Sequence, residues 1–405
     1  MAALSVADAL ARILADVESL RAADAPLTEA CGRVLTRDLQ ALRTQPPDAL
    51  SAMDGYAVRA VDVAQTPARL QVIGEVPAGR PFDLPVRAGE AARIFTGGVL
   101  PAGADTIVIQ ENTTREGDVV VVRQGAAPSR HVRAQGLDFK AGDCPLRCGH
   151  RLTARDLALA AAMNYAAVPV HRRPRVGVLA TGDELVPPGT PPAPGQIVHS
   201  NNFLLTALIR EEGAEPFDLG IASDRLDATV AALRRAKALD VDVLVTTGGA
   251  SVGDYDLVQP ALASEGMTLS FWKIAMRPGR PMMHGRLGAA HVLGLPGNPV
   301  STYVCALLFL VPLLRRLAGR TDLKLPVEQA QLGRDLAAND EREEYMRATL
   351  TRGSDGALIA TPFANQDSSL LTPLASADAL LIRPARAPAM PAGAPCNIIR
   401  LKHYG

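Results

Sequence analysis

The chain has 405 residues and a mass of 42.6 kDa, more than one ordinary core of about 100–200 residues accommodates. Its 42 Lys and Arg residues balance 42 Asp and Glu residues, and aromatic residues make up only 4% of the chain. This composition disfavours a nucleic-acid binder that depends on a basic surface or on base stacking. Apolar residues at 48% and charged residues at 21% are typical of a soluble globular chain.

Cysteine usage and hydrophobic patterning favour a cytoplasmic protein that spans no membrane. The five cysteines are too scattered for a disulfide framework, and the N-terminus lacks the pattern of a secretory signal. The longest apolar run, 304–314, contains Pro312 and is shorter than the ~20 residues that span a bilayer.

The first 173 residues are predicted to form a β module inserted into a helical linking region. Apolar residues at helical spacing near the N-terminus predict helix over about the first 45 residues, as far as Pro46 and Pro47. Short Val- and Ile-rich runs predict strands at 70–73, 91–95, 105–109 and 119–122. Thr153 is a predicted N-cap for a helix over 154–162. The predicted division is therefore 1–45 with 141–173 as the linking domain, and 46–140 as the inserted β domain.

The next 150 residues alternate strands with helices, which predicts a parallel sheet with right-handed crossovers. Predicted strands lie at 176–180, 215–219, 241–246, 268–274 and 291–293, and predicted helices at 200–212, 224–238 and 301–317. Short β-like runs return at 357–361, 379–382 and 396–401. The predicted fold class is multidomain α/β plus β: an α/β domain at 174–324 with a parallel-rich sheet, the inserted β module, the helical segment, and a C-terminal β-barrel-like domain at 325–405.

Each predicted strand of the α/β domain ends in a loop rich in glycine and charged residues. These loops are 181–184, 223–224, 247–256, 273–281 and 295–299. The carboxyl ends of parallel strands share one edge of the sheet, so the loops should converge there. Glycines let the backbone approach an anion, and carboxylates hold a hard cation. The sequence therefore predicts a site for phosphate together with Mg²⁺.

Other nucleotide and hydrolase signatures fit less well. The G-x-G-x-x-G and P-loop patterns are absent from the sequence. The segment 249–253 satisfies G-x-S-x-G after a strand, so a serine hydrolase that uses Ser251 is an alternative, with His284, His291 or His403 as its base. Asp254 and Asp256 would crowd that nucleophile with negative charge, which disfavours it.

The whole chain resembles the molybdopterin molybdotransferase family, which includes bacterial enzymes and the C-terminal domain of gephyrin. The matching segments, in the family's order, are 51–57 (SAMDGYA), 93–97, 101–105, 181–185, 248–253, 271–281 and 295–301. The resemblance implies a homodimer of four-domain subunits with an inter-subunit active site. It also implies a reaction in which molybdate and adenylylated molybdopterin, with Mg²⁺, give molybdenum cofactor and AMP.

The resemblance assigns roles to individual residues. The implied catalytic residues are Asp54, Thr96, Glu184, Asp224 and Asp256, with Glu184, Asp224 and Asp256 also around Mg²⁺. The implied substrate-binding residues are Asp138, Thr181, Gly182, Asp183, Gly248, Gly249, Ser251, Lys273, Arg277, Arg280, Pro296, Pro299, Arg342 and Ser368. Among them Lys273, Arg277 and Arg280 would hold anions, molybdate included, although the family often has Lys at the two Arg positions.

Asp54, Thr96 and Asp138 would reach the partner subunit's pocket. Implied partners are the second subunit, a small pterin substrate, and other cofactor-biosynthesis or acceptor proteins, with neither nucleic acid nor membrane. Two alternatives stay open. One is a non-catalytic scaffold, as gephyrin's domain also clusters receptors. The other is a different enzyme on the same molybdopterin-binding fold, such as an adenylyltransferase or a nucleotide amidase.

Overall fold

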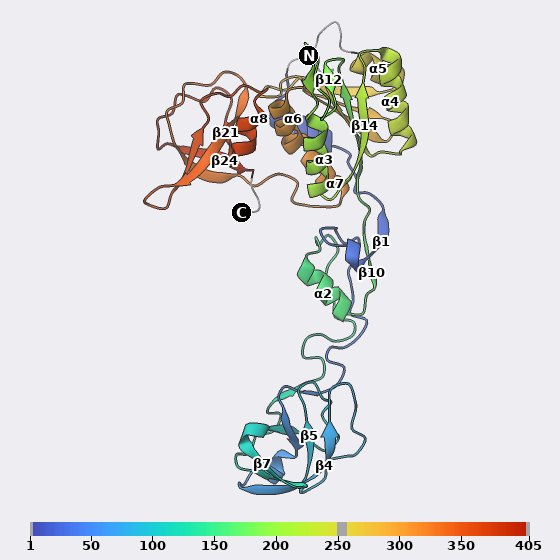
Figure 1. Cartoon of the computed structure of the whole chain (residues 1–405), viewed down its shortest axis with the longest axis vertical. Coiled ribbons are helices and arrows are strands. Elements are labelled where there is room, and N and C mark those ends of the chain that lie inside the picture. The colour runs from blue at the N-terminus through green and yellow to red at the C-terminus, as the bar shows by residue number, and fades with distance from the viewer. Residues whose placement is uncertain (1–2, 249–256, 402–405) are drawn as a thin grey trace. The chain divides into compact units, whose positions relative to one another are not determined.

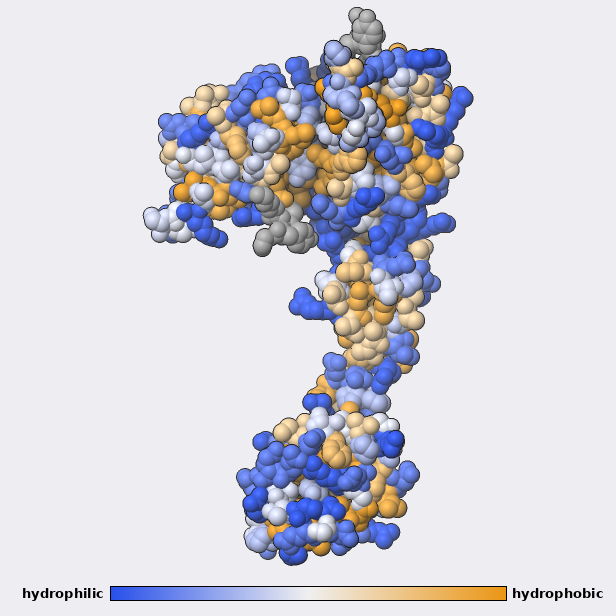
Figure 2. All heavy atoms as spheres, viewed as in Figure 1, coloured by the Kyte–Doolittle hydropathy of each residue, from blue (hydrophilic) through white to orange (hydrophobic). Residues whose placement is uncertain are grey.

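The computed structural model describes residues 3–248 and 257–401. The chain divides into two compact units, each described here by itself. Unit 1 comprises Met1–Ala23, Gly32–Thr36 and Val170–Gly405, and unit 2 comprises Asp24–Cys31 and Arg37–Pro169. Strands β1 (Ala22–Pro26) and β10 (Ala167–His171) pair where the chain leaves unit 1 and returns to it (Figure 1). Hydrophilic residues are spread over the visible face of both units, with hydrophobic residues among them (Figure 2).

Unit 2 is built on a mixed six-stranded sheet with the order β6-β3-β5-β4-β8-β7. Its strands are β3 (Gly55–Val58), β4 (Ala68–Val76), β5 (Glu90–Ile94), β6 (Thr106–Ile109), β7 (Thr113–Glu116) and β8 (Val119–Val122). Tyr56 and Val58 pack in one apolar cluster and Ala57 in another, as the alternation of side chains along a strand requires. Gly55 allows β3 to approach β6 closely, because a Cβ there would lie 2.1 Å from the carbonyl oxygen of Val108.

Shorter elements complete unit 2. Strand β2 (Leu50–Ser51) pairs with β9 (Val132–Arg133), and short 3₁₀ turns lie at Leu27–Glu29, Ala60–Val63 and Gln110–Asn112. Helix α2 (Ala154–Ala162) begins at the predicted residue. Thr153 and Asp156 form a reciprocal capping box, in which the Asp156 carboxylate accepts from the Thr153 backbone N–H at 2.7 Å.

The α/β part of unit 1 contains a six-stranded sheet with the order β14-β11-β15-β19-β18-β16. Its strands are β11 (Arg175–Thr181), β14 (Glu215–Ala222), β15 (Val243–Thr247), β16 (Thr268–Trp272), β18 (Met283–Leu287) and β19 (Ala290–Leu295). Strands β14, β11, β15 and β19 run parallel, whereas β18 is antiparallel to both β19 and β16. Strand β16 therefore points the same way as the parallel strands, and five strand ends share one edge.

Helices cover both faces of this sheet. Leu244 and Val292 belong to the core under α4 (Leu226–Ala238) and α5 (Val258–Ser264). Val243, Val245 and Leu293 face the opposite core, which includes residues of α1 (Val6–Leu14), α3 (Asn201–Glu211) and the segment Pro299–Leu317. Figure 1 shows α4 and α5 on one side of the sheet and α3 and α7 on the other.

Pro299–Leu317 is one continuous helix in three parts: α6 (Pro299–Cys305), a π-helical stretch (Ala306–Leu310) and α7 (Val311–Leu317). The π-helical stretch ends two residues before Pro312, whose ring would clash with the carbonyl group four residues earlier in a regular α-helix. By length and composition this helix could cross a bilayer, but 83% of its apolar window is buried inside the fold, as in the core helix of a folded domain.

The C-terminal part of unit 1 is a closed five-stranded barrel. Strands β21, β22, β20, β24 and β23 pair in that order, and β23 pairs back to β21. The strands are β20 (Glu328–Leu332), β21 (Glu343–Arg352), β22 (Leu358–Pro362), β23 (Ala379–Arg383) and β24 (Pro395–Arg400). The short strand β17 (Met276–Arg277) joins β21, and β12 (Leu185–Val186) pairs with β13 (Ile197–Val198). Helix α8 (Leu371–Ser376) lies between β22 and β23.

The predicted fold class is confirmed, with three corrections to its elements. Of residues 3–45, which the structure describes, only Val6–Leu14 form an α-helix, since Pro26, Gly32 and Pro46 break the pattern beyond it. The α/β sheet is mixed, because the unpredicted strand β18 returns to β19 through the two residues Gly288 and Ala289. Helix α4 begins at Leu226 with Arg225 at its N-cap, so Asp224 is not the cap. The division into four domains stays a prediction.

Candidate active site

Three strand ends of unit 1 pack against one another through glycines. Gly248, which follows β15, has φ +83°, and a Cβ there would lie 2.6 Å from the carbonyl oxygen of Thr181 at the end of β11. Gly297, which follows β19, would place a Cβ 3.8 Å from the Cα of Gly248. The Oγ1 of Thr181, a buried residue, donates to the Thr247 carbonyl at 3.5 Å. A side chain at position 248 would collide with the Thr181 backbone, so glycine is required there, whereas a Cβ at position 297 would make only an ordinary contact.

Carboxylates gather where β11 and β14 end. The Asp183 N–H donates to the Asp224 carboxylate at 3.3 Å, and the Asp224 N–H donates to the Asp183 carboxylate at 3.1 Å. The Glu184 carboxylate folds back over Gly182, where a Cβ would lie 2.2 Å from it. All three carboxylate residues are exposed.

Within residues 3–248 and 257–401, no group of three or more His, Cys, Asp or Glu side chains forms a preformed metal cage. The donor chemistry nevertheless suits Mg²⁺, which is commonly held by one or two carboxylates together with substrate phosphates.

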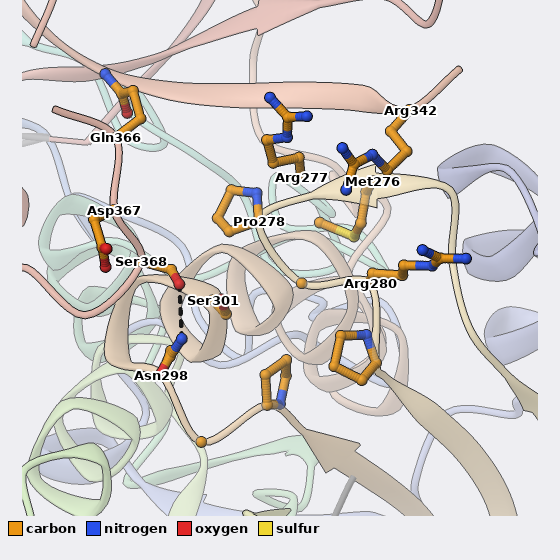
Figure 3. Close-up of a pocket in the computed structure, with 14 residues that line it drawn as sticks. Met276, Arg277, Pro278, Arg280, Asn298, Ser301, Arg342, Gln366, Asp367 and Ser368 are labelled. Carbon is orange, nitrogen blue, oxygen red and sulfur yellow. Dashed lines mark hydrogen bonds between the residues drawn. The ribbon is translucent and has the colours of Figure 1, made fainter. Parts of the chain in front are cut away.

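A pocket of about 700 Å³ lies beside these loops, between the helix α6 and the barrel. Figure 3 shows its lining, with Gln366, Asp367 and Ser368 on one wall and Arg277, Arg280 and Arg342 around the other. Pro296 and Gly297 also line the pocket, and the Asn298 amide donates to the Ser368 hydroxyl at 2.8 Å (Figure 3). Five predicted substrate-binding residues therefore line one pocket, namely Arg277, Arg280, Pro296, Arg342 and Ser368.

The three lining arginines differ in their partners. Arg277 donates to Asp340 at 2.7 Å and to Glu344 at 3.4 Å. Arg342 also binds Asp340, with its Nε 3.1 Å and 3.2 Å from the two carboxylate oxygens. Hydrogen bonds from the Arg342 side chain and backbone hold the pKa of Asp340 well below its ordinary value. Arg280 is exposed and has no charged partner among the described residues.

Two further predicted residues lie near this pocket without lining it. Lys273 follows β16 with φ +120°, a backbone conformation that L side chains rarely adopt. Its carbonyl accepts from the Leu4 N–H at 3.2 Å and its N–H donates to the Met282 carbonyl at 3.1 Å, which holds the strained residue in place. Pro299 is the first residue of α6, where a missing N–H costs nothing.

A fully buried arginine holds the pocket wall that contains Ser368. The Arg347 side chain on β21 donates to the carbonyls of Asn365, Asp367 and Leu370 at 3.2, 3.0 and 3.0 Å. The Gln366 side chain is bonded to the Arg347 backbone in both directions at 3.0 Å. Sequence reasoning missed Arg347, because a charged residue in a strand is usually exposed.

In unit 2, Asp54 and Thr96 form a tight pair. The Asp54 carboxylate accepts from the Thr96 backbone N–H at 2.7 Å and from its hydroxyl at 2.8 Å. These two hydrogen bonds lower the pKa of Asp54, the backbone bond first. Behind the pair, Arg93 lies between the rings of Tyr56 and Phe95, 5.2 and 5.0 Å from their centroids. The predicted residue Asp138 is exposed.

Several predicted residues lie outside the described part of the chain: Gly249, Ser251 and Asp256, with the neighbouring Asp254.

Two of the three histidines considered as the base of a serine hydrolase are buried. His284 and His291 stack on each other in the core with ring centroids 5.5 Å apart. His291 lies near the start of β19, at the opposite edge of the sheet from Gly248.

Asn201, the first residue of α3, was also missed by sequence reasoning. Its amide donates to the Gly297 carbonyl at 2.7 Å. The sequence feature that could have identified Asn201 is its position at the start of a predicted helix, beside the predicted ligand site.

The fold and the site together define a class of protein: an α/β domain, joined to a barrel, that presents carboxylates and arginines near the carboxyl ends of its parallel strands. Family models match three segments. These are the MoeA N-terminal region (domain I and II) at residues 4–164, a probable molybdopterin binding domain at 177–316, and the MoeA C-terminal region (domain IV) at 329–401.

Relatives extend the match along the chain. Molybdopterin molybdenumtransferase 2 of Mycobacterium tuberculosis is 38% identical over 380 residues, which cover 91% of this chain and 93% of the relative. Molybdopterin molybdenumtransferase of a Nostoc species is 39% identical over 332 residues, which cover 80% and 76%. The crystal structure of a molybdopterin biosynthesis MoeA protein from Pyrococcus horikoshii matches all of both chains with a TM-score of 0.85 and 30% identity.

The chain belongs to the MoeA, or molybdopterin molybdenumtransferase, family. This membership places it among the transferases of molybdenum cofactor biosynthesis.

Proposed function

We propose that the protein inserts molybdenum from molybdate into adenylylated molybdopterin and releases AMP, in the cytoplasm and with Mg²⁺. The observation that carries the proposal is the close approach of the Gly297 loop to Gly248, which brings together two chemically different surfaces. On one side lie the carboxylates Asp183, Glu184 and Asp224; on the other lies the arginine pocket. A diphosphate with its cation fits the first surface, and a tetrahedral oxyanion fits the second.

In this proposal the acidic residues of unit 1 hold the cation of the substrate. Glu184 and Asp224 would hold Mg²⁺ against the diphosphate, and we include Asp256 in this set. When bound, Mg²⁺ neutralises the charge that builds up as the bond between the two phosphate groups breaks. Gly182 and Gly248 belong to the diphosphate subsite in this proposal, and both have positive φ; at Gly182 the Glu184 carboxylate lies where a side chain would begin. Gly249 and Ser251 belong to the same loop in this proposal.

Arg280 is the lining arginine best placed to receive molybdate, since its charge is uncompensated among the described residues. Arg277, Arg342 and Lys273 contribute further positive charge, and the Ser368 hydroxyl offers a hydrogen bond. Thr181, Pro296 and Pro299 shape the loops that bring the two surfaces together. Holding both substrates in adjoining subsites would lower the entropic barrier to their reaction.

We propose further that the protein is a homodimer, in which Asp54, Thr96 and Asp138 serve the partner subunit's pocket. The Thr96 hydrogen bonds keep Asp54 ionised and oriented, as a residue that touches a metal-phosphate substrate should be. Mixing Asp54→Ala subunits with Asp224→Ala subunits tests this idea, because one intact site per heterodimer would restore activity. If no mixing ratio restores AMP release, the site is not shared.

The decisive experiment for the reaction measures AMP release from adenylylated molybdopterin with Mg²⁺, in the presence and absence of molybdate. Release that depends on both supports the proposal. Tight substrate binding without release would favour the scaffold alternative, and labelling of Ser251 by a fluorophosphonate would favour a hydrolase. Acceptor proteins for the product would then be sought by transfer of the finished cofactor.

A further inference from the structure

Carboxylates lie among the arginines of the pocket. Arg277, Arg280 and Arg342 line it, as does Asp367. Two more carboxylates, Asp340 and Glu344, lie directly against the lining arginines. Three carboxylates therefore lie among or against the three lining arginines, although the proposed ligand is a dianion. A site selected only for tight binding of a dianion would leave its arginines free.

Asp340 accounts for most of this compensation. One of its carboxylate oxygens accepts from Arg277 at 2.7 Å and from the Arg342 Nε at 3.1 Å, with a further short contact to the Arg342 Nη2. Its other oxygen accepts from the Arg342 backbone N–H at 2.9 Å. The Asp340 and Arg277 side chains keep 33% and 46% of their exposure, so solvent and ions reach this pair. A carboxylate shared by two guanidinium groups has the same bonding pattern as an oxyanion shared by them.

We propose that Asp340 acts as an internal counter-anion that sets the affinity and the charge selectivity of the pocket for tetrahedral oxyanions. Asp340 competes with an incoming oxyanion for Arg277 and Arg342, so the oxyanion is bound mainly by Arg280. The resulting moderate affinity lets the anion leave the pocket for the pterin rather than remain trapped. The inference rests on the proposed use of this pocket for molybdate, but it concerns binding and can be tested without the pterin.

Asp340→Asn is the informative variant. It removes one negative charge and keeps an oxygen that can accept from the Arg342 N–H, so the local turn is retained. Tungstate and perrhenate are suitable probes, because both are tetrahedral but carry two charges and one charge respectively. A Coulomb energy scales with ligand charge, so a gain of about tenfold for tungstate should accompany one of about threefold for perrhenate.

The measurement is isothermal titration of each anion into the full-length protein at low ionic strength, where surface charges are least screened. Glu344→Gln should give a smaller gain than Asp340→Asn, because Glu344 contacts Arg277 alone, at 3.4 Å. Glu328→Gln is the matched control: it removes the same charge from an Arg–carboxylate pair of the barrel, with Arg400, away from the pocket. It should leave both affinities unchanged.

A double-mutant cycle separates competition from general electrostatics. Arg277→Met should lose several times more tungstate affinity in the Asp340→Asn background than in the wild type, because only there is Arg277 released. Equal losses in both backgrounds would overturn the proposal. So would an Asp340→Asn protein that binds tungstate no tighter than the wild type, or one that gains equally for both anions. If Asp340→Asn fails to fold, Asp340→Ser is tested in the same way.

AMP release measured on the same proteins distinguishes this inference from the proposed function. A shift in anion affinity without AMP release by any variant would refute the reaction and keep the role of Asp340. AMP release with unshifted anion affinity would refute the role of Asp340 and keep the reaction.

Discussion

The two stacked histidines of the α/β core should make the protein sensitive to mild acid. His284 and His291 are 3% and 4% exposed, and their facing nitrogens, Nε2 and Nδ1, are 3.2 Å apart. The guanidinium group of Arg286 contacts the Nε2 of His291, which must accept because Arg has no acceptor. His291 then donates from Nδ1 to His284, and the Nδ1 proton of His284 is buried without a partner. The arrangement requires both rings to be neutral.

Burial, followed by the charge of Arg286, lowers the pKa of His284 to about 4 and that of His291 to about 3. In the unfolded chain both would titrate near 6.5. The unfolded state therefore binds more protons below pH 6.5, and stability falls as the pH falls from there towards the folded values. Between pH 7 and pH 5 each histidine should remove about 2 kcal/mol from the free energy of unfolding, and the pair about 4 kcal/mol. Burial also lowers the pKa of His199, which adds to the loss with the same sign.

Urea unfolding at pH 7 and pH 5, followed by fluorescence, measures this loss. The only tryptophan of the chain, Trp272, lies on β16 opposite Met283 of β18, so its signal reports on the same sheet. The double variant His284→Gln, His291→Gln should lose about 4 kcal/mol less than the wild type over this pH range. Phe271→Leu is the control, since it weakens the same core without removing a titrating group. An unchanged pH dependence in the double variant would refute the assignment.

Three other substitutions test the site. Gly248→Ala should abolish AMP release and destabilise unit 1, because the new Cβ would lie 2.6 Å from the Thr181 carbonyl oxygen. Its control is Gly220→Ala, at a similar φ but in open space, which should lower the free energy of unfolding in urea by only about 1 kcal/mol. Arg347→Met should remove roughly 3 kcal/mol of stability and most activity, because it removes the buried guanidinium group that bonds three carbonyls of the segment 365–370. Arg352→Met, on the exposed end of β21, should change stability by less than about 0.5 kcal/mol. Asp224→Asn should raise the Mg²⁺ concentration for half-maximal AMP release about tenfold, unlike Asp227→Asn, and an unchanged Mg²⁺ requirement would remove Asp224 from the cation site.

Features with a local cause could be predicted from the sequence. The helix after Thr153 begins as predicted because its capping box is contained within four residues. The convergence of the loops that follow the parallel strands could also be predicted, because each loop has glycines or charged residues directly after a strand. The family resemblance extended the prediction to residues such as Asp54 and Thr96, which the structure places in direct contact.

Features with a distant cause could not be predicted. Arg277 and Asp340 are 63 residues apart, and nothing near either residue indicates that a second domain supplies the partner of the first. Strand β21 escaped prediction because its buried position 347 is an arginine, whose partners lie 18 to 23 residues further on. The first 45 residues were predicted to be helical because apolar residues near the N-terminus recur at helical spacing. This spacing does not predict helix beyond residue 17, because Pro26, Gly32 and Pro46 interrupt it.

The pairing of β1 with β10 has a consequence for how the protein could be simplified. The chain leaves unit 1 at Ala23 and returns at Val170 along two hydrogen-bonded neighbours, with the Leu27 N–H still bonded to the Ala166 carbonyl at 3.2 Å. A hairpin turn at that point could replace the intervening segment 24–169. The design would have to provide for residues 32–36, which lie in that segment but belong to unit 1. The shortened chain would keep the arginine pocket and the carboxylate loops, so that the proposed anion binding could be measured without the contribution of the inserted module.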